Sequence, residues 1–235
     1  MKVELFGLVL PEVHPGEDLV KMMVDAAGKE AGGIVDGDIL VVTSKVVSKA
    51  YNLLIEIEKV EPKREALRIA KKTGMDPHMV QAVLDNSEEL LFAIPYRKLV
   101  EKGLVDIRTV SKDLERAHEV IEKIPCILCV QRGKQFYSDA GLDFSNHPEG
   151  VVSIPPPDPD SYAKELRKRI TEATGKETAV IISDTEGVIG LPGSLDIARG
   201  SSGIEVLLRS FGELDRFNKP KFAGADNIPN ELACA

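Results

Sequence analysis

Short apolar runs alternate with charged segments along most of the chain, and each change of pattern predicts a separate helix or strand. Residues 17–29 carry apolar side chains at helical spacing, as in Leu19, Val20 and Met23. Residues 39–42 (ILVV) and 179–183 (AVIIS) are short, mostly apolar runs typical of buried strands. These patterns predict a helix near the N-terminus and two interior strands far apart in the sequence.

Turn-forming residues divide the rest of the chain into further elements. Residues 62–73 and 77–85 predict two helices, the first ended by Gly74. A third helix starts after the proline-rich run 155–160, with Asp160 or Ser161 as its cap, and runs to Thr174. Residues 2–9 and 124–130 predict two further strands. Residues 97–123 predict a helical segment in which 103–110 could be a strand. Residues 193–203 predict a turn-rich connection.

Strands that alternate with helices indicate an α/β or α+β protein. The glycine-rich stretch GSLDIARGSSG, residues 193–203, matches neither a P-loop nor a dinucleotide-binding fingerprint. A length of 235 residues suits a single domain, which could be divided into lobes of about 1–125 and 126–235. The alternation of strands and helices therefore predicts a single α/β or α+β domain.

Composition narrows the functional classes. The net charge of −8 argues against a broad nucleic-acid-binding surface, although a local basic pocket is compatible with it. No apolar run approaches the roughly 18 residues of a membrane span. Glu4 interrupts the first apolar stretch, and no small-residue cleavage site follows it, so we expect no signal peptide and a cytoplasmic location.

The three cysteines do not indicate a metal or redox site. Cys126 and Cys129 form a C-x-x-C pair, and Cys234 is distant in the sequence. Three cysteines are too few for a disulfide framework, and zinc would need two more ligands. The pair lies in a predicted strand, where small buried cysteines are common, so we interpret it as structural.

Three polar segments could carry chemistry. The first, VVTSKVVSKA, places Ser44, Lys45, Ser48 and Lys49 just beyond a predicted strand. Hydroxyl and ammonium groups in this arrangement suit phosphate oxygens. The alternative is an ordinary solvated helix start in which Ser44 is the cap.

The other two segments are acidic. Asp139, Asp143 and Asn146 lie within SDAGLDFSN, and Asp184 and Thr185 precede Glu186 at the end of the strand 179–183. Oxygen ligands of this kind suit Mg²⁺ or Mn²⁺, and open α/β sheets place ligands at the carboxyl ends of their strands. The pattern is compatible with a metal–phosphate centre or with simple polar turns.

Taken in order, these segments resemble the gamma-glutamyl ligase family of coenzyme F420 biosynthesis. The resemblance rests on LPEV, GDILVVTSKVVSKA, SDAGLDFSN, PPPDPD, VIISDT and DIARGSSGIEVL, and it runs from Leu10 almost to the C-terminus. It implies an α/β (α+β) fold with a mixed sheet, of neither the P-loop nor the Rossmann type, and an intertwined homodimer.

The resemblance also implies an activity. Family members use GTP, Mn²⁺ or Mg²⁺, and usually K⁺, to add L-glutamate to the deazaflavin precursor through an acyl phosphate. Carried over to this sequence, the metal ligands are Asp143, Asp184 and Thr185, with Thr185 on a second ion. The nucleotide contacts are Leu10, Pro11, Glu12, Val13, Ser44, Lys45, Lys49 and Asn146, with the two lysines near the phosphates as catalytic groups.

The sequence departs from the family pattern after Thr185. There the family carries glycine, arginine and further basic residues, whereas this chain has Glu186-Gly187 and then the apolar run 188–191 (VIGL). It also has no counterpart of the family's MGQ-like segment before Ala235, and AYN replaces AEG at 50–52. Three interpretations follow: a ligase of this family, a ligase with a different acceptor, and a non-ligating paralogue that binds nucleotide or metal. Glu186 could replace a lost ligand or reflect another substrate.

Overall fold

A computed structural model describes residues 3–187 and 193–235. The chain forms two compact units, each assembled from separate segments. The first comprises Met1–Asn52, Pro155–Thr185 and Leu195–Ala235, and the second comprises Leu53–Ile154 and Glu186–Ser194. None of these bounds coincides with the expected lobe boundary near residue 125, because each unit joins segments that are distant in the sequence. The single-domain organisation of 1–235 stays a prediction.

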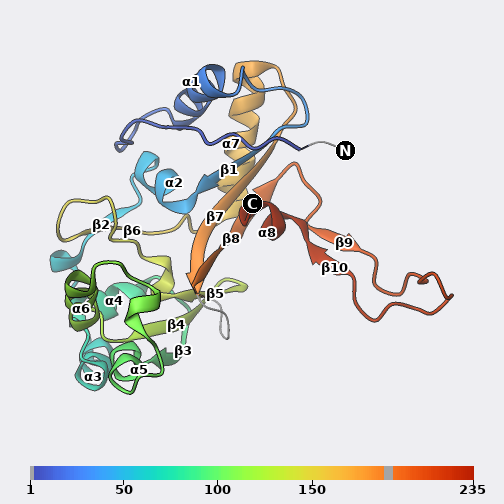
Figure 1. Cartoon of the computed structure of the whole chain (residues 1–235). Helices are drawn as coiled ribbons and strands as arrows, with labels where there is room; N and C mark the ends of the chain where they lie inside the picture. The colour runs from blue at the N-terminus through green and yellow to red at the C-terminus, as the bar shows by residue number, and fades with distance from the viewer. Residues whose placement is uncertain (1–2, 188–192) are drawn as a thin grey trace. The chain divides into compact units, whose positions relative to one another are not determined.

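The first unit contains a three-stranded sheet with the order β1-β7-β8 (Figure 1). Its strands are β1 (Ile39–Thr43), β7 (Ala179–Gly187) and β8 (Ser194–Ser202). The strands β1 and β7 are parallel, and their register pairs Ile39 with Ala179 and Thr43 with Ser183. Parallel pairing requires a long crossover connection, which explains why the two strands lie so far apart in the sequence.

Helices cover this sheet with apolar side chains. They are α1 (Leu19–Glu30), the short α2 (Ser44–Ala50) and α7 (Pro159–Thr174), and α1 lies beside α7 (Figure 1). The core that they form with the sheet contains Leu19, Leu166, Ile170, Val180 and Ile182, all of which are buried. Helical spacing of apolar residues on one face of α1 and α7 produces this core.

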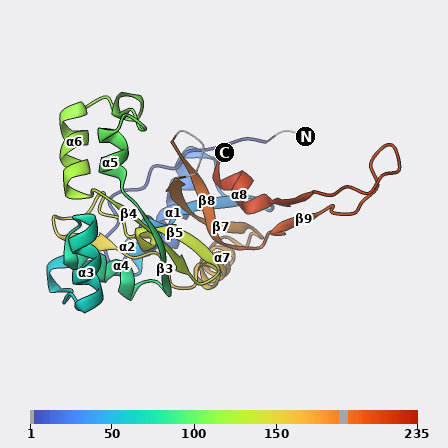
Figure 2. The same cartoon turned by 90° about the horizontal axis from the view of Figure 1, so that it is seen from below.

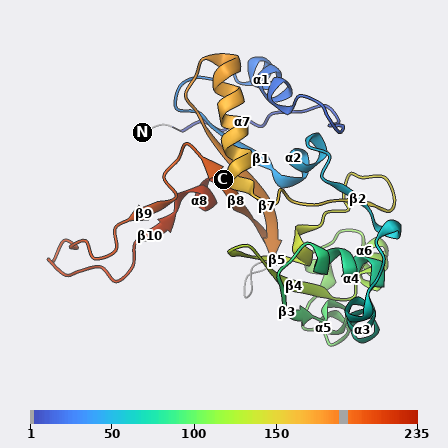
Figure 3. The ribbon, with the colours of Figure 1, turned by 180° about the vertical axis from the view of Figure 1, so that it is seen from behind.

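A two-stranded ribbon and a short helix complete the first unit. The strands β9 (Leu207–Arg209) and β10 (Ala225–Asn227) are antiparallel, and α8 (Ile228–Ala233) follows them. Figure 3 shows the ribbon and its connecting loop extending away from the β1-β7-β8 sheet. The extension exposes several large apolar side chains: Phe211, Leu214, Phe217 and Phe222.

The second unit has its own sheets and core. The antiparallel sheet β3-β4-β5 consists of β3 (Glu89–Ile94), β4 (Ile127–Arg132) and β5 (Gln135–Ser138), and β2 (Leu54–Glu56) pairs with β6 (Val151–Ser153). Its α-helices are α3 (Arg64–Thr73), α4 (Pro77–Asp85), α5 (Tyr96–Glu101) and α6 (Leu114–Lys123), with 3-10 turns at Ile57–Lys59, Ile107–Thr109 and Asp139–Gly141. The helices α5 and α6 lie side by side (Figure 2).

Several predicted elements are confirmed and others are corrected. The helices at 17–29 and 62–73 are present with small shifts at their ends, and the helix at 77–85 has the predicted bounds. Segment 97–123 contains two helices, and 103–110 forms no strand. The expected strand at 2–9 is wrong, because residues 3–9, the described part, have no regular secondary structure. The expected connection at 193–203 is also wrong, because β8 occupies most of it.

Local details are corrected as well. Asp158, not Asp160 or Ser161, caps α7, because its carboxylate accepts the backbone N–H of Ser161. In β1, Leu40 and Val42 are buried but Ile39 and Val41 are 41% and 44% exposed, so the strand is buried on one face only.

The overall class agrees with the sequence. The chain is α+β with several small sheets, while the specific family fold stays a prediction. Cys126 is buried, as predicted for the C-x-x-C pair, whereas Cys129 is only partly buried; Cys234 is exposed, and all three are free thiols. Within the described residues, no helix is long and apolar enough to cross a membrane.

Gly200 marks a close approach between β8 and the start of α7. A Cβ atom at Gly200 would lie 2.3 Å from the carbonyl carbon of Pro159. Next to it, the backbone N–H of Ser201 donates to Asp160 Oδ1 at 2.8 Å. The first turn of α7 therefore leaves no room for a side chain at position 200.

We expect Gly200→Ala to lower the free energy of unfolding by about 2 kcal/mol or more, because backbone must move to admit the methyl group. Gly28→Ala is the matched control: Gly28 lies within α1 with open space around its Cβ position, so alanine should stabilise by roughly 0.5–1 kcal/mol. Urea unfolding of both variants measures the difference. Equal stability of the two variants would contradict the close packing.

Candidate functional site

The carboxyl ends of β1 and β7 bring two polar residues together. The last paired residues are Thr43 and Ser183, so Ser44 and Asp184 follow at the same edge of the sheet. The Ser44 hydroxyl donates to Asp184 Oδ1 at 3.0 Å. Ser44 is the first residue of α2 and Thr43 occupies the cap position, which corrects the alternative in which Ser44 caps the helix.

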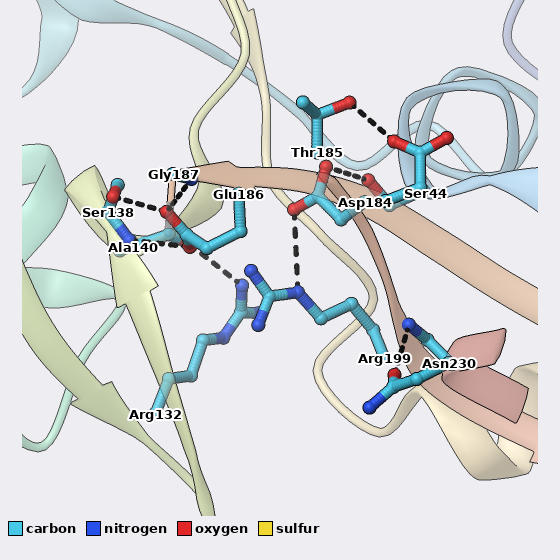
Figure 4. A network of polar contacts seen from close by, with 12 residues as sticks. Ser44, Arg132, Ser138, Ala140, Asp184, Thr185, Glu186, Gly187, Arg199 and Asn230 are labelled. Carbon is cyan, nitrogen blue, oxygen red and sulfur yellow. Dashed lines mark hydrogen bonds and ion pairs between the residues drawn. The ribbon is translucent and has the colours of Figure 1, made fainter. Parts of the chain in front are cut away.

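A buried arginine from the neighbouring strand faces the same carboxylate (Figure 4). Arg199 Nε lies 3.8 Å from Asp184 Oδ2, with 2% of the arginine side chain exposed and 17% of the aspartate. A guanidinium is always charged in proteins, and burial strengthens its attraction for a nearby carboxylate. The Ser44 hydroxyl thus contacts one oxygen of Asp184, and the Arg199 guanidinium approaches the other.

Thr185 is positioned by an acidic partner on β8. Its hydroxyl donates to Asp196 Oδ1 at 2.7 Å (Figure 4). Because the hydroxyl proton points to Asp196, the oxygen lone pairs are the part of Thr185 that can accept a hydrogen bond or coordinate a cation.

The segment that contains Leu10, Pro11, Glu12 and Val13 lies against α2 in the first unit. The Glu12 carboxylate forms an ion pair with the ammonium of Lys49, which is largely buried. Val13 packs into the core, and the N–H of Gly16 donates to the carbonyl of Ala50 at 2.9 Å. The first unit therefore holds this segment and Ser44, Lys45, Lys49, Asp184 and Thr185.

Asp143 and Asn146 belong to the second unit. Asp143 Oδ1 accepts the backbone N–H and the hydroxyl of Ser145, both at 2.7 Å, and its backbone pairs with Ser153. Asn146 has a left-handed φ of 59°, which asparagine tolerates better than most residues. These local bonds build the turn that carries both side chains.

Glu186 has a structural partner within the second unit. Its carboxylate accepts the N–H of Ser138 at 2.9 Å and also the Ser138 hydroxyl (Figure 4). Ser138 leads into Asp139 and Ala140, two non-glycine residues with positive φ. Glu186 thus secures a turn of costly backbone conformation. The apolar run 188–191, the other departure from the family pattern, lies outside the described residues.

Asp139 is the titratable group with the most altered environment in this turn. Burial raises the pKa of its carboxyl to about 6, the hydrogen bond from the N–H of Leu128 opposes the increase, and the negative charge of Glu186 adds to it. A carboxyl group with this pKa changes its charge close to neutral pH.

The donor set of the first unit suits a hard divalent cation. Asp184, Thr185 and Asp196 offer carboxylate and hydroxyl oxygens, the ligands that Mg²⁺ and Mn²⁺ prefer. Across the described parts of the chain, no group of three or more His, Cys, Asp or Glu side chains is arranged to hold a metal ion. Mg²⁺ commonly takes only one or two protein carboxylates and completes its shell with water and substrate phosphates, so the partly exposed Asp184 carboxylate could serve as one such ligand.

Sequence reasoning missed Asp196 and Arg199. Both lie in the segment expected to be a turn-rich connection, so neither was assigned to a strand face. Leu195, Ile197 and Arg199 alternate with smaller or polar residues, and period-two spacing is the signal that could have placed Arg199 on an apolar face.

Comparison with known proteins identifies the class. The "Coenzyme F420:L-glutamate ligase" of Methanothermobacter thermautotrophicus is 31% identical, covering all of this chain and 82% of the relative. Proteins of the same name from Archaeoglobus fulgidus and Methanocaldococcus jannaschii are 33% and 34% identical, each over 99% of this chain and 80% of the relative. These relatives are ligases.

The chain also matches the family described as F420-0:Gamma-glutamyl ligase over residues 7–235. It therefore belongs to the F420-0:gamma-glutamyl ligase family, as the order of its polar segments predicts.

We expect the stability of the protein to depend on the charge of Asp139. Its folded pKa of about 6 exceeds the ordinary 3.8, so its contribution is fully present below pH 3.8 and is lost as the pH rises through about 6. Between pH 4 and pH 8, wild type should lose about 2–3 kcal/mol relative to Asp139→Asn, which keeps an oxygen for the Leu128 N–H. Chemical unfolding across this range measures the difference, with the exposed Asp226→Asn as a control for net charge. A constant difference would contradict the buried carboxyl.

Proposed function

We propose that this chain is a ligase that joins L-glutamate to the deazaflavin precursor F420-0 through an amide bond. The observation that carries the proposal is the family match over residues 7–235, supported by relatives that are named for glutamate ligation. The sheet edge at Ser44 and Asp184 supplies the polar groups that such chemistry needs.

We propose GTP as the activating nucleotide. Leu10, Pro11, Glu12 and Val13 line the base, and Ser44, Lys45 and Lys49 contact the phosphates. Support comes from the first unit, where the Glu12–Lys49 ion pair holds the first segment against α2. Asn146 keeps its predicted nucleotide contact.

The proposed reaction has two steps. The substrate carboxylate attacks the γ-phosphorus of GTP, which forms an acyl phosphate and releases GDP. The glutamate amine then attacks the acyl carbon, the C–O bond to phosphate breaks, and the amide, inorganic phosphate and a proton result. Lys45 and Lys49 serve the first step because phosphoryl transfer depends mainly on positioning and charge neutralisation.

We propose Asp184 and Thr185 as ligands of Mn²⁺ or Mg²⁺, with Thr185 on a second ion, and Asp143 keeps its predicted role as a further ligand. A bound divalent cation would neutralise part of the phosphate charge. K⁺ is a further proposed requirement. Ser44 orients the Asp184 carboxylate through the hydrogen bond to Oδ1.

The environment of Glu186 supports a second candidate function. The family pattern has a basic loop after Thr185, and in this chain Glu186 instead holds Ser138. Glu186 is negatively charged and bonded to Ser138, so it cannot replace a basic side chain that would bind an anionic substrate. This favours either a different acceptor or a paralogue that binds nucleotide without ligation.

We expect GTP with Mn²⁺ to raise the melting temperature, because a ligand that binds only the native state stabilises it. At 100 times the Kd the gain is about 2.7 kcal/mol, a shift of roughly 5–10 °C for a protein of this size. Asp184→Ala should abolish the shift, and Asp226→Ala, which removes an exposed carboxylate, should retain it. Differential scanning fluorimetry measures both. No shift with GTP or ATP would refute the nucleotide site.

Product analysis separates the candidate functions. Mass spectrometry of a reaction with F420-0, L-glutamate, GTP and Mn²⁺ should show the glutamyl product, with one phosphate released for each amide formed. A thermal shift without product or phosphate release would favour the non-ligating paralogue. Phosphate release only with another carboxylate acceptor would favour the changed substrate.

We further propose that the protein is a homodimer assembled through the ribbon β9–β10 and its loop. This extension exposes Phe211, Phe217 and Phe222, the last to 91%. Exposed aromatic side chains on an extension commonly mark a protein interface.

Replacing Phe217 and Phe222 by serine should weaken dimerisation by at least about 30-fold, since buried aromatic anchors each contribute around 2 kcal/mol or more. Light scattering coupled to size-exclusion chromatography measures the mass as a function of concentration. Leu104→Ser is the matched control, because Leu104 is also exposed but belongs to the second unit. A wild-type monomer, or equal dimerisation of all three proteins, would refute the proposal.

A further inference from the structure

We propose that Arg199 is a positioning residue that weakens the binding of a divalent cation to Asp184 when no nucleotide is bound. The inference rests on the proposed role of Asp184 as a metal ligand. Arg199 lies in β8 and was not among the predicted site residues, and we assign to it control of the affinity of Asp184 for the cation.

The burial of Arg199 supports an action through Asp184. With 2% of its side chain exposed, the guanidinium is closed to a substrate arriving from solvent. Asp184 is more accessible, at 17%, and Arg199 Nε lies 3.8 Å from its Oδ2. The carboxylate is therefore a group through which the charge of Arg199 can act on a ligand.

Electrostatics gives the direction of the effect. A permanent positive charge close to Asp184 neutralises part of the attraction that the carboxylate exerts on a divalent cation, and it repels the cation itself. It also approaches Oδ2, while Ser44 occupies Oδ1 with a hydrogen bond. A cation must compete with both groups. Nucleotide phosphates would bring the negative charge that offsets the guanidinium.

The backbone around Arg199 is held on both sides. The preceding residue, Ala198, donates its N–H to the side-chain oxygen of Asn230 at 2.9 Å (Figure 4). The following residue, Gly200, packs directly on Pro159. These contacts fix the strand at the point where the arginine leaves it.

The test is a Mn²⁺ titration of the full-length chain without nucleotide, in which electron paramagnetic resonance measures free Mn²⁺. We expect Arg199→Met to bind Mn²⁺ at least about tenfold more tightly than wild type, because one buried positive charge is removed. Arg199→Lys keeps the charge and should remain within about threefold of wild type. Adding Asp184→Asn to Arg199→Met should remove the gain.

Arg169→Met is the matched control. Arg169 lies in the same unit, on α7, and pairs with Asp18, so its replacement changes the net charge equally without touching Asp184. Its Mn²⁺ affinity should equal that of wild type. An equal gain in this variant would reduce the effect to net charge and overturn the proposal.

Thermal melts separate this role from a purely structural one. Loss of one partner of a buried ion pair should lower the melting temperature of Arg199→Met without metal. Added Mn²⁺ should then raise it by more than it raises that of wild type. If the methionine variant does not fold, Arg199→Gln removes the same charge and retains a hydrogen-bonding group. Unchanged or weaker Mn²⁺ binding in the folded neutral variant overturns the proposal.

Ligation assays on the same samples distinguish failure of the Arg199 proposal from failure of the proposed ligase activity. Tighter Mn²⁺ binding without any glutamyl product supports the role of Arg199 and refutes the ligase activity. Product formation by wild type with no change in Mn²⁺ affinity on replacing Arg199 refutes the present inference alone.

Discussion

The parallel pairing of β1 with β7 is the interaction on which the candidate site depends. It aligns residues that are 140 positions apart, so that Ser44 and Asp184 meet at one edge of the sheet. A shift of one residue in this register would turn the side chains of a strand to its opposite face. The alternating burial of β1 and the fully apolar start of β7 resist such a shift. Register, rather than any single polar contact, therefore determines which residues can act together.

Much of the fold follows from local signals in the sequence. The helices α3 and α4 carry their own start and stop residues, including Pro77 and the left-handed Gly74, and their bounds were close to those predicted. Strand β8 could not be predicted in this way, because its glycine and serine residues are weak strand formers and pairing with β7 stabilises it. The segment 3–9 has a strand-like composition but no partner strand in the described structure.

The candidate site was predictable in part for the same reason. Ser44 and Asp184 follow apolar runs, and the rule that ligands gather at strand ends identified both. Arg199 depends on tertiary burial, which composition does not reveal. Glu186 shows the limit most clearly: it follows Thr185 directly, yet the two adjacent residues belong to different compact units and have different partners. The spacing of residues within this short motif could not predict that Thr185 and Glu186 belong to different units.

The contact between Gly200 and Pro159 has a consequence for how this protein can diverge. The side chain before the contact, Arg199, approaches Asp184, and the backbone N–H after it, of Ser201, donates to the Asp160 carboxylate on α7. A mutation that enlarges position 200 would therefore disturb both a helix start and the charge beside the carboxylate.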